Sequence, residues 1–509
     1  MEHALQPRTG LLSASLLVLA GAAAAQDQSW EASGTGGDLY GHAVRPAGDV
    51  NGDGFDDVVV GASHDVTHGI WAGAAHVLSG ADGSALWIFH GETSGGFFGA
   101  AVSGAGDVDA DGTPDLVIGA PGDYRTGTPP GQAFVYSGLD GHLIHTLPER
   151  NPSEQFGVAV SDAGDVDLDG HADVAVGAVR RSMLRGGVTV FSGLTGAVLW
   201  ETLGEQALDY LGRPLCRAGD VDRDGRDDLL VGSSGGYVRV HSGLDGTILY
   251  TSRRGFPGDG YGMAVASLGD LGYDEIPELL VGAPMGEVDG QAYVLDGRRG
   301  ELLYLLEGEL DHEAFGTAVS GAGDLNGDGR RDWLVGAPLG MLDDGRRGSV
   351  YAFSGQNGAL LYTWRRAQPY ELFGAAVAGG LHADGDGFAD LVVGSPEYSG
   401  PSSGRVALFR GNDLFLTATP AALGTGDTLT LVAGLGTLFR PAAIYLVEID
   451  GTPVFVPVLE GTFDPRGELV FTATVPPGVT SHHSLTFHAF GIHWTGALID
   501  SSDVVVTIH

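Results

Sequence analysis

A pair formed by an aromatic residue or leucine and a glycine recurs seven times, and it limits the possible folds more than any other feature of the chain. The pairs are Tyr40-Gly41, Phe98-Gly99, Phe156-Gly157, Leu211-Gly212, Tyr261-Gly262, Phe315-Gly316 and Phe373-Gly374. Successive glycines lie 50 to 58 residues apart. A fixed period of about this length is typical of architectures in which each repeat forms one supersecondary unit.

Each repeat contains four short segments with the character of β-strands. The pair opens the first, an acidic loop leads to a second such as Asp57–Ala62, and later runs such as Ala133–Gly138 and Leu143–Thr146 supply the third and fourth. Four strands in each of seven repeats predict an all-β, seven-bladed β-propeller. A solenoid would also repeat, but it would need capping units at its ends.

The two ends of the repeat region predict how the ring closes. Ser29–Ala32 resembles a fourth strand but precedes the first repeat, whereas the last repeat reaches only its third strand at Val406–Phe409. We therefore expect the N-terminal strand to complete the seventh blade, which leaves no open sheet edge at the seam. The propeller is predicted to span residues 29–413.

An acidic loop begins eight residues after the glycine of each pair. In the first repeat it reads Asp-Val-Asn-Gly-Asp-Gly-Phe-Asp-Asp over residues 49–57. Oxygens at positions 1, 3 and 5 can converge on one cation, glycine at position 6 permits a sharp turn, position 7 offers a backbone carbonyl, and position 9 a closing carboxylate. All-oxygen ligation of this kind suits Ca²⁺ far better than Zn²⁺ or Cu²⁺.

The predicted Ca²⁺ ligands occupy positions 1, 3, 5, 7 and 9 of the loops. They are Asp49, Asn51, Asp53, Phe55 and Asp57; Asp107, Asp109, Asp111, Thr113 and Asp115; Asp165, Asp167, Asp169, His171 and Asp173; Asp220, Asp222, Asp224, Arg226 and Asp228; Asp324, Asn326, Asp328, Arg330 and Asp332; and Asp384, Asp386 and Asp390. An EF-hand is excluded because position 12 is valine or isoleucine and strands flank the loop. Aspartate-rich turns without metal are the alternative.

Two loops depart from the pattern. In the fifth, Gly272 replaces the ligand at position 3, Glu275 replaces the turn glycine, and Glu278 replaces the closing aspartate. In the seventh, His382 replaces the first aspartate. We expect about five to seven calcium sites, with the fifth weak or empty.

Charge and the N-terminal segment indicate where such a chain works. The formal net charge of -39 repels nucleic acid and anionic lipid headgroups, so neither is an expected partner. Residues 1–25 are typical of a signal peptide, because the apolar run Leu11–Ala20 precedes the small residues Ala23–Ala25. We expect a secreted protein, extracellular, cell-surface or periplasmic, without a transmembrane segment. Cys216 is the only cysteine, so no internal disulfide can form.

Residues 414–509 lack the repeat. They hold β-rich runs such as Thr428–Val432 and Ala443–Val447, separated by glycine and proline turns. We predict a small C-terminal β-sandwich-like domain.

The order of motifs within a repeat resembles a known family. Phe98-Gly99, the loop from Asp107 to Asp115 and Gly119-Ala120-Pro121 follow one another as in the FG-GAP repeats of the integrin-α N-terminal propeller and its bacterial relatives. The resemblance covers about residues 29–413. It implies a seven-bladed propeller in which calcium in the loops between first and second strands is structural, and in which ligands bind on the opposite face.

That opposite face would be built from loops rich in arginine and aromatic residues, which are typical anchors for partners. The candidate ligand-binding residues are Trp71, Tyr124, Arg125, Arg181, Arg347 and Tyr398. A solvated rim with scattered arginines is the alternative interpretation.

The functional hypothesis is a secreted calcium-binding propeller that acts as an adhesion or ligand-binding module for a protein or glycan. An extracellular hydrolase or lyase, or a structural surface scaffold, are the alternatives. Gly232–Gly236 matches the nucleophile-elbow pattern, but it occupies the place of the Gly-Ala-Pro turn and no helix follows. The sequence indicates no catalytic residues, and the oligomeric state stays open.

Overall fold

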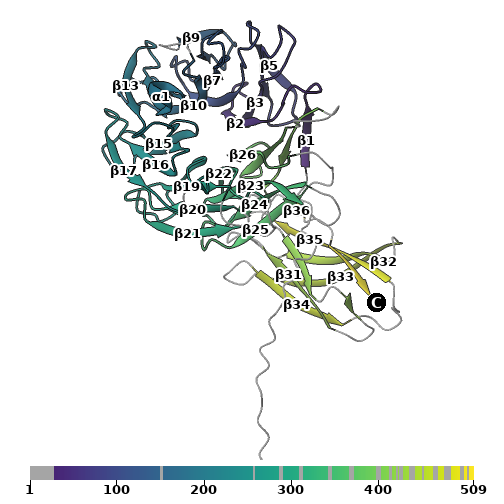
Figure 1. Ribbon diagram of the computed structural model, residues 1–509. Coiled ribbons are helices and arrows are strands. Elements are labelled where there is room, and N and C mark those ends of the chain that lie inside the picture. Colours follow the sequence, from purple (N-terminus) through teal and green to yellow (C-terminus); the bar gives the residue numbers. More distant parts are fainter. Residues whose placement is uncertain are drawn as a thin grey trace, which may run out of the picture.

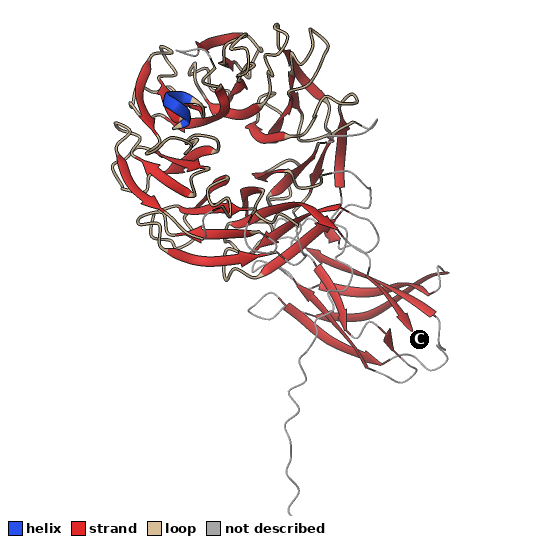
Figure 2. Cartoon of the chain, in the orientation of Figure 1, coloured by secondary structure: helices blue, strands red, loops and turns tan. Residues whose placement is uncertain are grey.

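The computed structural model describes residues 28–148, 153–255, 258–285, 290–308, 313–341, 347–365, 372–396 and 403–411, and then only the strands of the C-terminal segment. These residues are almost entirely β-strands and their connections, with the four-residue α1 (Arg181–Leu184) as the one helix among them (Figure 2). The predicted signal peptide lies outside the described residues.

Seven four-stranded antiparallel sheets form the blades of a β-propeller, as predicted (Figure 1). The first four blades are β2 (Ala43–Gly48), β3 (Asp57–Ala62), β4 (Ala74–Leu78) and β5 (Ala85–His90); β6 (Ala101–Gly106), β7 (Asp115–Ala120), β8 (Gln132–Tyr136) and β9 (Leu143–Pro148); β10 (Phe156–Gly164), β11 (Asp173–Ala178), β12 (Gly187–Phe191) and β13 (Val198–Leu203); and β14 (Leu215–Gly219), β15 (Asp228–Ser233), β16 (Tyr237–His241) and β17 (Ile248–Ser252).

The remaining three blades follow the same order. They are β18 (Ala264–Gly269), β19 (Glu278–Ala283), β20 (Gln291–Leu295) and β21 (Leu302–Glu307); β22 (Ala318–Gly323), β23 (Asp332–Met341), β24 (Arg347–Phe353) and β25 (Leu360–Arg365); and β26 (Ala376–Leu381), β27 (Asp390–Ser395) and β28 (Arg405–Phe409) with β1 (Gln28–Ser33).

The N-terminal strand closes the ring, which confirms the prediction from the sequence. β1 pairs antiparallel with β28, with Trp30 opposite Leu408 and Ala32 opposite Val406. The Trp30 indole also donates a hydrogen bond to the Gly80 carbonyl oxygen of blade 1, 2.7 Å away. The first and last strands of the propeller are therefore joined by a sheet ladder, and a side-chain bond from β1 links the seam to blade 1.

Other outer strands reach the next blade by the same kind of bond. The indole of Trp200 donates to the Gly243 carbonyl at 2.8 Å, and the Tyr250 hydroxyl donates to the Gly297 carbonyl at 2.6 Å. The hydrophobic core lies between the blades. At the seam, Val58 and Val60 of blade 1 belong to one buried cluster with Val392 of blade 7 and its neighbours.

The glycines of the Phe-Gly and Gly-Ala-Pro motifs meet between adjacent blades. A Cβ atom built on Gly119 would lie 2.0 Å from the carbonyl oxygen of Gly157 in the next blade. The same contact recurs seven times, at 2.0 to 2.2 Å, and the last joins Gly394 to Gly41 across the seam. Glycine is required at these positions because any side chain would overlap a backbone atom of the next blade.

The C-terminal segment is also all β. Its strands are β29 (Phe415–Thr419), β30 (Ala422–Leu423), β31 (Thr428–Gly434), β32 (Ala442–Ile449), β33 (Thr452–Gly461), β34 (Glu468–Thr474), β35 (His483–Ile492), β36 (Leu498–Asp500) and β37 (Val504–Ile508). They form a three-stranded sheet, β29-β31-β34, and a six-stranded sheet built around β35. The packing of side chains between these sheets lies outside the described residues, so the sandwich stays a prediction.

The blade contact predicts a strong effect of a single methyl group. We expect Gly119→Ala to lower the free energy of unfolding by about 2 kcal/mol or more, because the added atom meets a backbone oxygen that cannot move independently. Urea denaturation followed by tryptophan fluorescence measures the change. Gly272→Ala is the matched control, since its nearest neighbour would be 3.7 Å away. Equal stabilities for the two variants would contradict this account.

Candidate metal centre

The acidic loops join the first and second strands of each blade, and their own side chains shape them. In the loop between β6 and β7, Asp107 accepts the backbone amides of Asp111 and Gly112, each at 3.0 Å. Asp109 accepts the Asp111 amide at 3.1 Å, and Asp111 accepts the Thr113 amide at 2.8 Å. Aspartates favour such local bonds to the backbone, so the alternation of acidic residues itself curls the loop.

The aspartate at position 9 is buried and fixes the loop to the rest of the blade. Asp115 accepts the Val108 amide at 2.7 Å with one carboxylate oxygen and the Gly138 amide at 3.0 Å with the other. Gly138 lies in the turn between the third and fourth strands. The same two bonds are made by the equivalent aspartates of the other blades except the fifth: Asp57, Asp173, Asp228, Asp332 and Asp390.

Carboxylate oxygens converge in three loops. Within each of three groups, the ligand oxygens lie within 4.8 Å of one another: Asp107, Asp109 and Asp115; Asp165, Asp167 and Asp173; and Asp220, Asp222 and Asp228. The backbone amides use only some of the lone pairs of these carboxylate oxygens, so the remaining lone pairs are available to a cation. Grouped carboxylates of this type are compatible with a divalent cation.

In three loops the side chain at position 7 turns away from its own loop and bonds to the loop of the preceding blade. Arg226 donates to the Val166 carbonyl at 2.7 Å, Arg330 donates to the Leu271 carbonyl at 2.9 Å, and His171 lies 2.8 Å from the Val108 carbonyl. Since these side chains are engaged elsewhere, position 7 could serve a cation only through its backbone carbonyl, as the sequence predicts. The loops are thereby linked from blade to blade.

Electrostatics add to the case for a cation. Burial, reinforced by neighbouring carboxylates, raises the pKa of Asp57, Asp115 and Asp173 to about 6 and that of Asp228 to about 7. Burial is the largest cause for Asp332 too, whose pKa is raised to about 8. A raised pKa means that the ionised carboxylate is unfavourable in its buried position, and a bound cation would stabilise the ionised form.

The fifth loop keeps three acidic side chains around an open space. A Cβ atom built on Gly272 would lie 3.7 to 3.9 Å from oxygens of Glu278, Asp274 and Asp270. Glu278 still accepts the Leu271 amide, at 2.6 Å. The loop therefore keeps acidic side chains at positions 1, 5 and 9 and lacks a side-chain ligand at position 3. The expectation that this site is weak or empty stays a prediction.

The seventh loop contains positive charge that sequence reasoning missed. The Arg410 guanidinium forms an ion pair with Asp384, with 3.1 Å between Nε and the carboxylate oxygen. Ser79, Ser137, Ser192, Ser242 and Ser354 hold the equivalent position in five other blades, so this arginine could have been found by aligning the repeats. Burial and the neighbouring carboxylates raise the pKa of Asp386 to about 8.

The candidate ligand-binding residues lie on the connections between the second and third strands, at the ends of the blades opposite the acidic loops. Trp71 is 49% exposed and stacks on Phe97 with 6.0 Å between ring centroids. Tyr124 is 39% exposed, and the guanidinium carbons of Arg125 and Arg180 lie 5.6 and 4.6 Å from its ring centroid. The structure places these residues in two clusters, one on blade 1 and one beside blade 2.

The other three candidates are not equivalent to these. Arg181 is engaged, because it donates to Glu201 at 2.6 Å and to Thr189 at 3.1 Å. Arg347 begins β24, but its side chain is outside the described residues, as is the whole of Tyr398. The candidacy of all six stays a prediction.

Sequence reasoning also missed a set of buried acids on this face. An acidic residue stands two positions before the aromatic-glycine or leucine-glycine pair in most repeats, and Asp38, Glu154, Asp209, Asp259 and Glu313 are buried. Asp209 accepts the Tyr237 hydroxyl at 2.8 Å, and Glu313 accepts the Tyr351 hydroxyl at 2.7 Å. Ser233, from the rejected nucleophile-elbow match, is fully buried and donates to the Asp209 carbonyl. These groups hold the loops in place.

Comparison with known proteins supports the identification of FG-GAP repeats in this chain. The FG-GAP repeat model matches residues 40–78, 98–136, 315–353 and 373–409, and an FG-GAP-like repeat model matches residues 220–281. Integrin alpha-5 of Xenopus laevis is 32% identical over 251 residues, which is 47% of this chain and 20% of that protein. Integrin alpha-PS2 of Drosophila melanogaster is 30% identical over 368 residues, 64% of this chain and 22% of that protein.

The chain thus spans about one fifth of the length of these curated relatives. The residues matched by the family models all lie within the propeller. Within the part of the chain that the structure describes, no helix has the length and apolar character needed to span a membrane.

The position-9 aspartate predicts coupled losses of stability and metal. We expect Asp115→Asn to lower the free energy of unfolding by about 2 kcal/mol, because an amide nitrogen would face one of two backbone donors. The same variant should bind one calcium ion fewer in equilibrium dialysis. Asp245→Asn, in an exposed turn, is the control. Unchanged stability and calcium content in Asp115→Asn would contradict the role assigned here.

The raised pKa values predict competition between protons and calcium. In the metal-free folded protein these carboxyls are protonated below about pH 6, whereas in the unfolded chain they lose their protons near pH 4. Protonation therefore stabilises the folded state at low pH, and this stabilisation is lost as pH rises from about 4 through 6. Calcium must displace the protons, so its affinity should increase between pH 5 and pH 7.5. Isothermal titration calorimetry at several pH values measures this trend. An affinity independent of pH over this range would count against carboxylate ligation.

Proposed function

Because this chain is an FG-GAP repeat protein similar to integrin α subunits, we propose that it is a secreted, calcium-binding β-propeller that binds a protein or glycan partner. Calcium would hold the loops on one face, and the partner would bind the opposite face. The acidic loops lie at one end of the blades and the exposed aromatic and arginine residues lie at the other end, which supports the assignment of metal and partner to opposite faces.

The convergence of three aspartates in each of three loops is the observation that carries the calcium proposal. Aspartates at positions 1, 3, 5 and 9 would hold the ion together with the carbonyl at position 7. A bound Ca²⁺ would neutralise carboxylates that burial makes costly to charge. Since the loops of blades 3, 4 and 6 are bonded to the loop of the preceding blade, order in one loop would reinforce order in the next.

The exposed aromatic residues favour a partner on the opposite face. Trp71 presents an aromatic ring to solvent beside Phe97, and Tyr124 does so beside two guanidinium groups. Exposed tryptophan, tyrosine and arginine are common among the residues that dominate binding energy at protein interfaces. Export from the cell fits the acidic composition, because extracellular calcium would fill such sites. It also fits the N-terminal segment, whose sequence is typical of a signal peptide.

Removal of calcium tests the first half of this function. We expect five to seven ions on the purified protein by atomic emission, and a melting temperature that falls by about 10 °C or more after chelation with EGTA. Magnesium should restore little of the loss because it demands a smaller, octahedral site. Fewer than three ions, or identical melts with and without EGTA, would overturn the calcium proposal.

A binding screen tests the second half. The full chain, fluorescently labelled and calcium-loaded, is applied to arrays of extracellular matrix proteins and of glycans. We expect a partner whose binding falls at least about tenfold in Trp71→Ala or Tyr124→Ala, as for a central aromatic anchor. Leu244→Ala, exposed in a turn on the calcium-loop side, is the control. Chemical turnover of the bound partner would instead support the enzyme alternative.

A further inference from the structure

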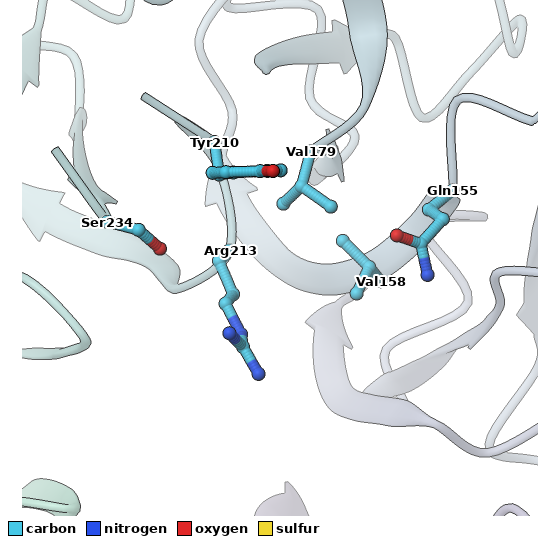
Figure 3. A pocket seen from close by; sticks show the side chains of 6 residues that line it. All are labelled: Gln155, Val158, Val179, Tyr210, Arg213 and Ser234. Atoms are coloured by element: carbon cyan, nitrogen blue, oxygen red, sulfur yellow. The ribbon is translucent and has the colours of Figure 1, made fainter. Parts of the chain in front are cut away.

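A hollow of about 290 Å³ lies between blades 3 and 4, at the ends of the strands opposite the acidic loops. The side chains that line it are Gln155, Val158, Val179, Tyr210, Arg213 and Ser234. Figure 3 shows Gln155 and Val158 on one side, Tyr210, Arg213 and Ser234 on the other, and Val179 beside the Tyr210 ring. Two blades therefore contribute to a single site.

Ser234, one of the lining residues, belongs to a very short connection between the second and third strands of blade 4. Only residues 234–236 join β15 to β16, whereas residues 63–73 join β3 to β4 and residues 121–131 join β7 to β8. Ser234 in this turn and Arg213 are exposed, and Tyr210 is half-buried.

The backbone turn before each aromatic-glycine or leucine-glycine pair places a side chain at this face. Gln155 and Tyr210 occupy that position with φ of 55° and 49°, in the left-handed region. Leu39, Phe97 and Ala314 have the same conformation in other blades, so the turn belongs to the propeller as a whole. What distinguishes blades 3 and 4 is that the residue there carries a hydrogen-bonding side chain.

Arg213 directly follows the glycine of its leucine-glycine pair, and its side chain differs in its contacts from residues at the same position in other blades. In blade 1 His42 lies 2.9 Å from the Leu39 carbonyl, and in blade 6 Thr317 donates to the Ala314 carbonyl at 2.7 Å. Arg213 is exposed and forms no ion pair and no hydrogen bond with any residue that the structure describes. Arg239 of the same blade, by contrast, is buried and forms an ion pair with Glu205.

We propose that this hollow binds the carboxylate side chain of an aspartate or glutamate on a partner protein. The Arg213 guanidinium would hold the carboxylate by paired hydrogen bonds, the strongest geometry for this contact. The side chains of Gln155, Tyr210 and Ser234, which also have no partner in the described residues, offer further donors. This inference rests on the proposed binding function of the same face and names what the face recognises.

The lining favours an acidic peptide over an acidic sugar. Val158 and Val179 form an apolar wall, which suits the methylene groups of aspartate or glutamate. A uronic acid carries hydroxyl groups around its ring, and contact with such a wall would leave some of them without hydrogen-bond partners. The net charge of -39 repels an acidic partner at long range, so we expect binding to strengthen as salt screens that repulsion.

The test compares a carboxylate with its neutral amide. N-acetylglutamate amide and N-acetylglutamine amide are titrated into the calcium-loaded full chain, and binding is followed by saturation-transfer difference NMR. We expect the acid to bind about tenfold more tightly, as a hydrogen-bonded charge pair implies. Arg213→Gln should abolish this preference. Arg298→Gln removes the same charge from an exposed turn on the acidic-loop side and should preserve it.

The outcomes separate this inference from the proposed function. Equal binding of acid and amide in the unmodified protein, or an acid preference that survives Arg213→Gln, overturns the inference. If array partners still bind in that case, the proposed function stands without it. If the acid preference is present and depends on Arg213 while no array partner binds, the hollow is confirmed as a carboxylate site and the proposed binding function of the face fails. A uronate that binds as tightly as the glutamate derivative would overturn the choice of a peptide.

Discussion

The contact between a glycine Cα atom and a carbonyl oxygen of the next blade is the constraint on which this propeller depends. It recurs at all seven blade junctions, including the seam, and leaves no room for a methyl group. The same glycines are paired differently within a blade, where the Gly99 amide donates a hydrogen bond to the Gly119 carbonyl at 2.9 Å. Blade spacing is therefore set by backbone atoms, so the hydrophobic residues between blades only have to fill a gap of fixed width.

A second constraint acts on the face that carries the acidic loops. Seven loops meet around one end of a narrow ring, and each would repel its neighbours if its carboxylates were free. Buried position-9 aspartates accept two backbone amides each, and in three loops the position-7 side chain bonds to a carbonyl of the preceding loop. Metal binding would thus complete a structure that the backbone has already shaped, rather than create it.

Much of this could be predicted from the sequence because the repeat encodes contacts that are the same in every blade. The pairs at Phe98-Gly99 and its counterparts predict the number of blades, and β1 pairs with β28 as expected. The Arg410–Asp384 ion pair, the buried acids such as Asp209, and the hollow beside Arg213 were not predicted. Each depends on which side chains from two connections come together, and a repeat alignment shows this only where one blade departs from the others.

Those departures are where a repetitive fold can acquire a specific task. Seven equivalent blades offer seven equivalent surfaces, so a partner can be positioned only where the equivalence is broken. Blade 4 has a short connection between its second and third strands, and Gln155, Tyr210 and Arg213 replace residues that elsewhere are apolar or bonded to the backbone. The rigid ring holds these side chains in a fixed arrangement, which reduces the entropy lost when a partner binds.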